Sequence, residues 1–191
     1  MNALKLDEAR AAEHEKYSRC YEKAHYRMGA RRMDDAIRDL EDIPSRGSYL
    51  DVSCGRGEML RHAYKLGFGK AKGTEIVRRL IDGERVVFAE VHALPFDVDA
   101  FDVVSMFDVI EHLVPGDDEL ACRELARVAK KHVLLTANNR PSLNHVGDDL
   151  HINKRGYEEW DSLFRQWFYP NKVMWIRNHD YVSEGWRIDF S

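Results

Sequence analysis

The stretch Tyr49-Leu-Asp-Val-Ser-Cys-Gly-Arg-Gly-Glu-Met-Leu60 has the pattern of a short strand, a tight turn and the start of a helix. The strand is apolar and ends at Asp51. Gly55 and Gly57 in the turn let the backbone approach a ligand closely, because glycine has no Cβ atom. The N-terminus of the following helix also presents free N–H groups. The stretch therefore predicts a ligand-binding turn.

Further segments along the chain alternate between the patterns of strands and helices. Predicted strands cover residues 70–76, 85–89, 101–108, 131–137, 173–177 and 186–190. Predicted helices cover residues 7–43, with a break near Gly29, and residues 77–81, 117–129 and 154–168. The segment 101–108 is nearly continuous in apolar residues, as a strand buried on both faces should be. The alternation predicts an α/β fold, a three-layer α/β/α sandwich around a doubly wound, mostly parallel sheet.

The connections between these segments carry further information. The third and fourth strands are separated by a short segment that contains Pro95, so we expect a loop alone to cover that side of the sheet. Residues 138–153 form a long polar loop, and loops of that length inside a domain are usually functional or mobile. The chain's tryptophans gather near its C-terminus and predict that the last helix and hairpin pack against the sheet edge; they are Trp160, Trp167, Trp175 and Trp186.

Composition narrows the class of protein. With 44% hydrophobic and 32% charged residues, the chain resembles an ordinary soluble globular protein. A net charge of -4 argues against a dominant nucleic-acid footprint. No apolar run approaches the roughly 20 residues that cross a bilayer, and residues 1–16 lack the apolar core of a signal peptide. The three cysteines show no paired metal-ligand spacing and suit a reducing compartment, so we expect a cytoplasmic protein without a membrane partner.

Five segments, in this order and spacing, resemble the motifs of class I S-adenosylmethionine-dependent methyltransferases. They are Leu50–Gly57, Gly73–Glu75, Ala93–Phe96, Phe101–Val104 and Val109–Leu113. The resemblance covers roughly residues 45 to 140. It implies a seven-stranded sheet whose last strand is antiparallel. It also implies S-adenosylmethionine as the cofactor and S-adenosylhomocysteine as the product, bound over the carboxyl ends of the first four strands.

The resemblance implies a set of cofactor-binding residues, which are Asp51, Gly55, Gly57, Glu75, Glu90, Val91, His92, Phe107 and Asp108. Asp51 and the two glycines line the methionine end, and residues 90–92 hold the adenine. Glu75 follows Asp51 by 75 − 51 = 24 residues, close to the interval at which an acidic residue reaches a ribose diol. Its carboxylate can accept both hydroxyl protons in strong, charge-assisted bonds. Phe107 and Asp108 face the sulfonium or the acceptor.

Ser53 departs from the pattern, because the family commonly has its first glycine at that position. If the backbone there needs a positive φ, serine costs about 1 kcal/mol.

Binding of a nicotinamide dinucleotide is the rival interpretation of such a turn. Its fingerprint needs a third glycine where Leu60 stands, and Glu58 would repel a pyrophosphate on the helix N-terminus, so this alternative is disfavoured.

The chain is interpreted as one domain of residues 1–191 in three parts: a helical lid at 1–44, a cofactor-binding core at 45–140, and an acceptor loop, helix and C-terminal hairpin at 141–191. Two interpretations of the N-terminal helices stay open. They can pack over the domain, or they can bring Tyr17, Tyr21, Tyr26 and Arg27 over a ligand.

Candidate catalytic groups are the imidazoles nearest the expected cleft, those of His112, His145 and His151. A general base is needed only if the acceptor must lose a proton, and each histidine can instead be a solvated loop or capping residue. Asp148 and Asp149 are too small a cluster to predict a metal site, so none is assigned.

Only the absence of certain sequence motifs limits the chemical class of the methyl acceptor. The chain has no Asn/Asp-Pro-Pro-aromatic tetrapeptide, no Pro-Cys pair and no room for a target-recognition domain. We therefore expect methyl transfer to oxygen or nitrogen of a small-molecule acceptor, while a protein or nucleic-acid acceptor stays open, as does the oligomeric state. The alternative function is a non-catalytic protein that binds the adenosyl cofactor, alone or as a subunit of a larger complex.

Overall fold

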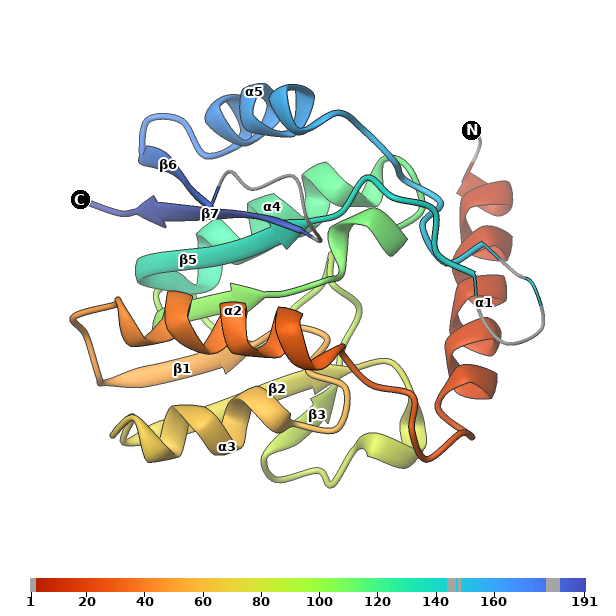
Figure 1. The fold of residues 1–191 in the computed structure, drawn as a ribbon, viewed down its shortest axis with the longest axis horizontal. Helices are drawn as coiled ribbons and strands as arrows, with labels where there is room; N and C mark the ends of the chain where they lie inside the picture. The colour runs from red at the N-terminus through yellow and green to blue at the C-terminus, as the bar shows by residue number, and fades with distance from the viewer. Residues whose placement is uncertain (1–2, 144–146, 148, 178–182) are drawn as a thin grey trace.

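A seven-stranded sheet, in the order β3-β2-β1-β4-β5-β7-β6, forms the centre of the computed structural model, which describes residues 3–143, 147, 149–177 and 183–191 (Figure 1). The strands are β1 (Ser48–Asp51), β2 (Lys70–Glu75), β3 (Val86–Phe88), β4 (Phe101–Met106), β5 (Ala129–Ala137), β6 (Lys172–Arg177) and β7 (Glu184–Asp189). Strands β1 to β5 pair in parallel, and β7 runs antiparallel to both β5 and β6. The predicted fold class is confirmed.

Most helices fall within a few residues of the predicted segments, but residues 21–29 are not helical, and the short helix at residues 110–112 was not predicted. The helices are α1 (Ala3–Cys20), α2 (Ala30–Glu41), α3 (Glu58–Lys65), α4 (Asp117–Val128), α5 (Tyr157–Trp167) and the short 3-10 helices η1 (Arg78–Leu80) and η2 (Ile110–His112). The predicted break at Gly29 is the N-cap of α2. Among the described residues, none of the helices combines the length and apolar character needed to cross a membrane.

Two apolar cores flank the sheet, because successive side chains of a strand point to opposite faces. Tyr49 and Val103 pack with Leu40 of α2 and with the apolar side of α3. Leu50, the next residue of β1, packs on the other face with Leu125 of α4 and with α5. Helices therefore cover both faces, as a parallel sheet buried on both sides requires.

A loop alone connects β3 to β4, as predicted from the shortness of this segment. Residues 89–100 contain turns and bends but no helix. Val91 and Leu94 are buried there and join the core beneath α4. The loop therefore takes the place that a helix occupies elsewhere in the sheet.

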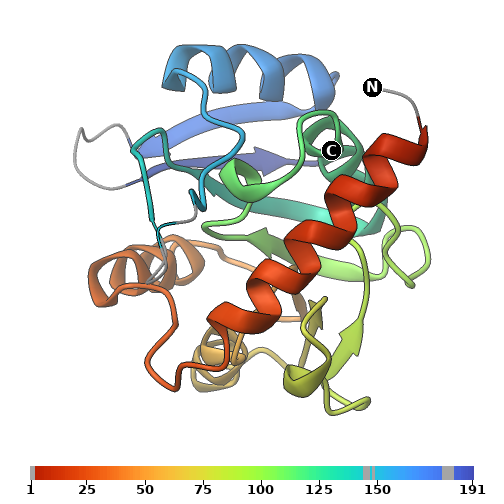
Figure 2. The ribbon, with the colours of Figure 1, turned by 90° about the vertical axis from the view of Figure 1, so that its right-hand side faces the viewer.

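Helix α1 does not join either layer. It lies across the end of the sheet toward which β1 and β5 point (Figure 1), and in the turned view it crosses that end diagonally (Figure 2). Of its side chains whose burial is described, Lys16 and Cys20 are fully buried. In contrast, α2 buries Ala36 and Leu40 against the sheet. The segment 1–44 therefore contains a helix over the strand ends and a helix that packs on the sheet face.

The C-terminal tryptophans pack α5 and the β6–β7 hairpin together, as the sequence predicts. Trp160 stacks on Phe164 with ring centroids 5.4 Å apart, and Phe164 meets the edge of Trp186 at 5.0 Å. Trp175 stacks on the other side of Trp186 at 5.4 Å. Aromatic pairs of this kind add about 0.5–1.5 kcal/mol beyond their buried area.

We expect Phe164→Ala to lower the free energy of unfolding by about 3–5 kcal/mol, because Phe164 is fully buried and contacts three tryptophans. Urea denaturation followed by circular dichroism measures the change. Leu120→Ala, at a residue of α4 that is 42% exposed, is the control and should cost less than about 1 kcal/mol. Equal losses in the two variants would contradict the assignment of this cluster to the core.

Candidate cofactor and acceptor site

The turn between β1 and α3 is built from residues with positive φ. Ser53, Gly55 and Gly57 have φ angles of 59°, 54° and 70°. The left-handed conformation of Ser53 therefore has the expected steric cost of about 1–2 kcal/mol for an L-residue. A Cβ atom on Gly55 would lie 2.5 Å from the hydroxyl oxygen of Tyr21, so this position also lacks space for a side chain.

Glu75, at the carboxyl end of β2, fixes this turn from the neighbouring strand. Its Oε2 accepts a hydrogen bond from the Gly55 N–H at 2.9 Å, and its Oε1 accepts from Ile76 and Val77 at 2.8 and 3.0 Å. Burial raises the pKa of Glu75, and the backbone N–H donors oppose this rise. A carboxylate has about four lone-pair positions, so about one remains for a ribose hydroxyl rather than the predicted pair.

Asp51, at the carboxyl end of β1, is buried and lies next to two hydroxyl groups. The Ser105 hydroxyl donates to its Oδ1 at 2.7 Å, and the Tyr49 hydroxyl lies 2.6 Å from the Ser105 oxygen. Burial raises the pKa of Asp51 to about 7, although these hydroxyl bonds oppose the shift. A cation next to Asp51 would restore its charged form near neutral pH.

A cavity of about 320 Å³ opens over the carboxyl ends of these strands. Eight of the nine predicted cofactor-binding residues line it: Asp51, Gly55, Glu75, Glu90, Val91, His92, Phe107 and Asp108. Gly57 does not line the cavity; it is the N-cap of α3 in the left-handed conformation, so it shapes the turn. Tyr17, Tyr21, Tyr26 and Arg27, the residues of the alternative lid interpretation, also line the cavity.

The cavity walls carry more negative than positive side chains. Seven carboxylates line it, those of Glu13, Asp51, Glu58, Glu75, Glu90, Asp108 and Asp117, against the guanidinium groups of Arg10, Arg27 and Arg32. The excess suits a ligand with cationic groups and disfavours one rich in phosphates.

Polar side chains of α1 hold that helix over the cavity. Arg10 forms a two-point ion pair with Asp117 at the start of α4. His14 contacts both carboxylate oxygens of Glu90, at 2.9 and 3.1 Å. Burial would raise the pKa of Glu90, but the bond and charge of His14 lower it, and the same pair raises the pKa of His14. Tyr17 lies 2.7 Å from His112 Nδ1.

The sequence did not predict these α1 contacts, although it contains a signal for them. Arg10, His14 and Tyr17 are spaced four and three residues apart, which places them on one face of a helix. A second contact that the sequence missed joins α2 to the site: Arg32 donates to the Asp108 carboxylate at 2.8 Å.

Two of the three candidate catalytic histidines lie together in the cavity wall. The rings of His112 and His151 meet edge to face, with centroids 4.6 Å apart, and both residues line the cavity. Burial lowers the pKa of both imidazoles, that of His112 to about 4. They are therefore uncharged at neutral pH, and His112 is a weak base. His145 lies outside the described residues.

Comparison with known proteins identifies the family. The model of a methyltransferase domain family matches residues 24–184. A search of curated proteins gives no match. Solved structures with the same fold include Burkholderia thailandensis 1,6-didemethyltoxoflavin-N1-methyltransferase with bound 1,6-didemethyltoxoflavin and S-adenosylhomocysteine, which is 15% identical with a TM-score of 0.69, over 96% of this chain and 88% of that chain.

Two archaeal structures show the same fold. A protein of Pyrococcus horikoshii OT3 is 16% identical with a TM-score of 0.66, over 86% of this chain and 92% of its own. An Archaeoglobus fulgidus S-adenosylmethionine-dependent methyltransferase is 17% identical with a TM-score of 0.62, over 85% of this chain and 95% of its own. The acidic cavity and the glycine turn fit a ligand with an ammonium and a sulfonium. The chain therefore belongs to the class I S-adenosylmethionine-dependent methyltransferases, with S-adenosylmethionine as its cofactor and S-adenosylhomocysteine as the product.

Proposed function

We propose that this methyltransferase acts on an oxygen or nitrogen atom of a small molecule. The observation that carries the proposal is the cavity of about 320 Å³ beneath α1, which is lined by the predicted cofactor residues and by residues of the acceptor loop, Ser142, Leu143, Leu150 and His151. Ligand pockets for small molecules begin at about 300 Å³. A duplex or a folded protein would have to displace α1 before reaching the strand ends.

The negative charge of the cavity walls also favours a small-molecule acceptor. The seven carboxylates that line the cavity would repel a phosphate backbone. The Burkholderia thailandensis structure in the comparison carries 1,6-didemethyltoxoflavin, a small molecule, beside S-adenosylhomocysteine. This supports a small acceptor for the present chain without identifying it.

The cofactor supplies a methyl group on a positively charged sulfur. The acceptor's lone pair forms the new bond to the methyl carbon as the carbon–sulfur bond breaks, the electron pair stays on sulfur, and the acceptor's proton passes to solvent. The chain's own contribution is to hold the partners in line and to exclude water. Asp51 holds the methionine end of the cofactor and Glu75 holds its ribose, and α1 closes the cavity above them.

We further propose that α1 acts as a lid that moves to admit the ligands. Its contacts over the cavity are ion pairs and hydrogen bonds, those of Arg10, His14 and Tyr17, rather than a continuous apolar seam. Lys16 adds a bond to the backbone oxygen of Asp149, so α1 also touches the acceptor loop. Segments with few buried apolar contacts open at low free-energy cost.

Cofactor affinity should depend on the protonation of Asp51. Because its pKa is raised to about 7, Asp51 loses charge as the pH falls through 7, and its attraction for the cofactor's ammonium weakens. We expect S-adenosylhomocysteine to bind several-fold more weakly at pH 5.5 than at pH 7.5, by titration calorimetry. Asp51→Asn should bind weakly at both pH values. A pH-independent affinity in the wild-type protein would remove Asp51 from the ammonium site.

Hydrogen exchange tests the lid. On addition of S-adenosylhomocysteine, we expect peptides from α1 and from residues 149–153 to become protected together, because Lys16 and Tyr17 join these segments. Peptides from α5, which packs on the same face of the sheet as α4 and does not line the cavity, serve as the internal reference and should not change. Protection at the cofactor turn without any change in α1 would contradict the lid.

Transfer is tested with methyl-labelled S-adenosylmethionine and fractionated cell extracts. We expect label in the small-molecule fraction and none in the macromolecular fractions. Glu75→Gln removes one negative acceptor from the cofactor site and should reduce labelling by tenfold or more, whereas Glu84→Gln, at an exposed turn residue, should not. Label in protein or nucleic acid would overturn the acceptor class. Tight binding of S-adenosylmethionine without labelling of any fraction would favour the non-catalytic alternative.

A further inference from the structure

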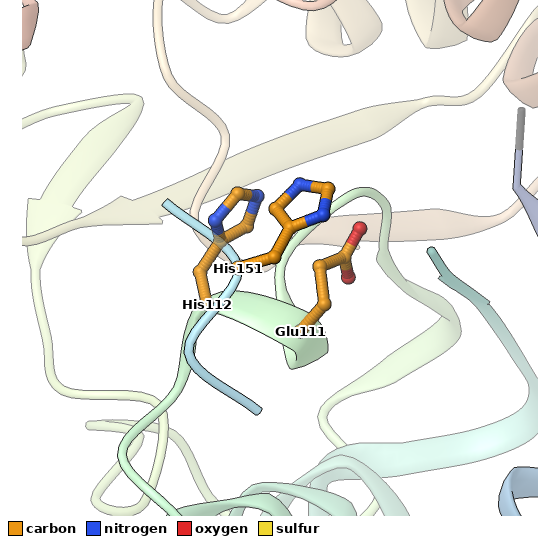
Figure 3. A group of neighbouring side chains, drawn as sticks. All are labelled: Glu111, His112 and His151. Atoms are coloured by element: carbon orange, nitrogen blue, oxygen red, sulfur yellow. The ribbon is translucent and has the colours of Figure 1, made fainter. Parts of the chain in front are cut away.

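Three side chains from two separate segments converge beside the cavity. Glu111 and His112 belong to η2, directly after β4, and His151 belongs to the loop that precedes α5. Figure 3 shows the three side chains gathered at one point. One potential ligand atom from each lies within 4.8 Å of the others. His112 and His151 also line the cavity, so the cluster borders the space assigned to the acceptor.

Three polar atoms of this cluster lack a hydrogen-bond partner among the described residues. Both carboxylate oxygens of Glu111 and the Nε2 atom of His151 are buried without a hydrogen bond to the described residues. The exposed fractions of the two residues are 0% and 1%. Burying an unpaired polar group costs about 1–3 kcal/mol. Burial and the neighbouring Asp108 carboxylate raise the pKa of Glu111 well above its ordinary value, and an adjacent cation would restore its charged form. Three unpaired atoms at one point therefore indicate a ligand that satisfies all of them.

Backbone carbonyls fix both imidazoles in the orientation that a metal ligand needs. His151 Nδ1 lies 2.5 Å from the carbonyl oxygen of Arg140, and His112 Nδ1 lies 2.7 Å from that of Leu150. A hydrogen on Nδ1 donates to the carbonyl and leaves the lone pair on Nε2. At His112 the Tyr17 hydroxyl oxygen, also 2.7 Å from Nδ1, shares this hydrogen as a second acceptor. Histidines that bind metals show this arrangement, because the second bond sets the tautomer and the ring orientation.

The two segments that carry the cluster are also held together by their backbones. The Asn153 N–H donates to the carbonyl oxygen of Glu111 at 3.0 Å. The Asn153 side-chain amide also donates to the carbonyl oxygen of Ile110 in η2, at 3.4 Å. The loop is therefore fixed against η2 independently of the three side chains, so their convergence is built into the fold.

We propose that Glu111, His112 and His151 bind one divalent transition metal ion at the acceptor side of the cavity. Two neutral imidazoles with one carboxylate favour ions such as Zn²⁺, Mn²⁺ or Co²⁺ over Mg²⁺, which prefers oxygen ligands. Metal–ligand bonds of about 2.1 Å in a tetrahedral site place ligand atoms about 3.4 Å apart. Since the atoms lie within 4.8 Å of one another, a closure of about 1.4 Å or less completes the site.

An ion with three protein ligands keeps at least one coordination position open. From this position it can polarise an acceptor hydroxyl and lower the pKa of its proton. This role rests on the proposed methyl transfer. Ion binding itself does not, because it depends only on the three side chains.

Equilibrium dialysis of the chelator-treated, full-length protein against Mn²⁺, Co²⁺ or Zn²⁺ tests the site. We expect saturable binding of one ion per chain for at least one metal, and Co²⁺ should give absorption bands of an imidazole-containing site. Glu111→Gln and His151→Asn should each weaken binding by tenfold or more. His62→Asn is the matched control, because His62 lies in the last turn of α3 and outside the cavity, and it should leave binding unchanged.

The same preparations are titrated with S-adenosylhomocysteine to show that each variant is folded. If Glu111→Gln fails to bind it, His112→Asn and His151→Asn replace that variant. The absence of saturable binding for all three metals up to about 1 mM overturns the proposal. Metal binding that is unchanged in the folded variants of the cluster also overturns the proposal. Metal binding without methyl transfer keeps the site and removes only the proposed function, whereas transfer that survives the chelator removes the ion's role in activation.

Discussion

The hydrogen bonds between the Glu75 carboxylate and three backbone N–H groups are the interaction on which the site depends. One of them reaches across from β2 to the Gly55 turn that follows β1, and the others close the turn that follows β2. An acidic residue here therefore does two tasks: it aligns two loops, and it leaves a remaining lone pair for the ligand. Charge-assisted bonds to backbone donors are strong enough to keep such a carboxylate in place despite its burial.

The parallel sheet makes this alignment useful, because the carboxyl ends of adjacent strands lie at one edge. Glu75 is the last residue of β2, Asp51 is the last residue of β1, and Asp108 follows β4. These three strands are neighbours in the sheet. The same edge receives α1 and the acceptor loop from outside the sheet. The cavity is thus walled by segments far apart in the sequence, and each wall is positioned by a different strand or by α1.

The sequence predicted what is locally encoded. The strand, turn and helix at residues 49–60 follow from glycine positions and apolar periodicity, and Ser53 adopts the positive φ that its place in the turn requires. The cluster of Glu111, His112 and His151 could not be predicted, because 39 residues separate the two histidines (151 − 112 = 39) and only the packing of the loop against η2 brings them together. For the same reason, the periodicity of apolar residues could not predict the ion pair of Arg10 with Asp117, which lie far apart in the sequence.

Helix α1 links the two halves of the cavity. His14 contacts Glu90 at the end assigned to adenine, and Tyr17 contacts His112 beside the acceptor loop. Three residues of helix rise by only about 4.5 Å, so both contacts belong to one rigid face. The His14–Glu90 pair is strongest while His14 is protonated, and the pair itself raises the pKa of His14, so the contact is lost only as the pH rises through that raised value. A movement of α1 that frees Glu90 must also move Tyr17 away from His112, and the cofactor end and the acceptor end of the cavity therefore open together.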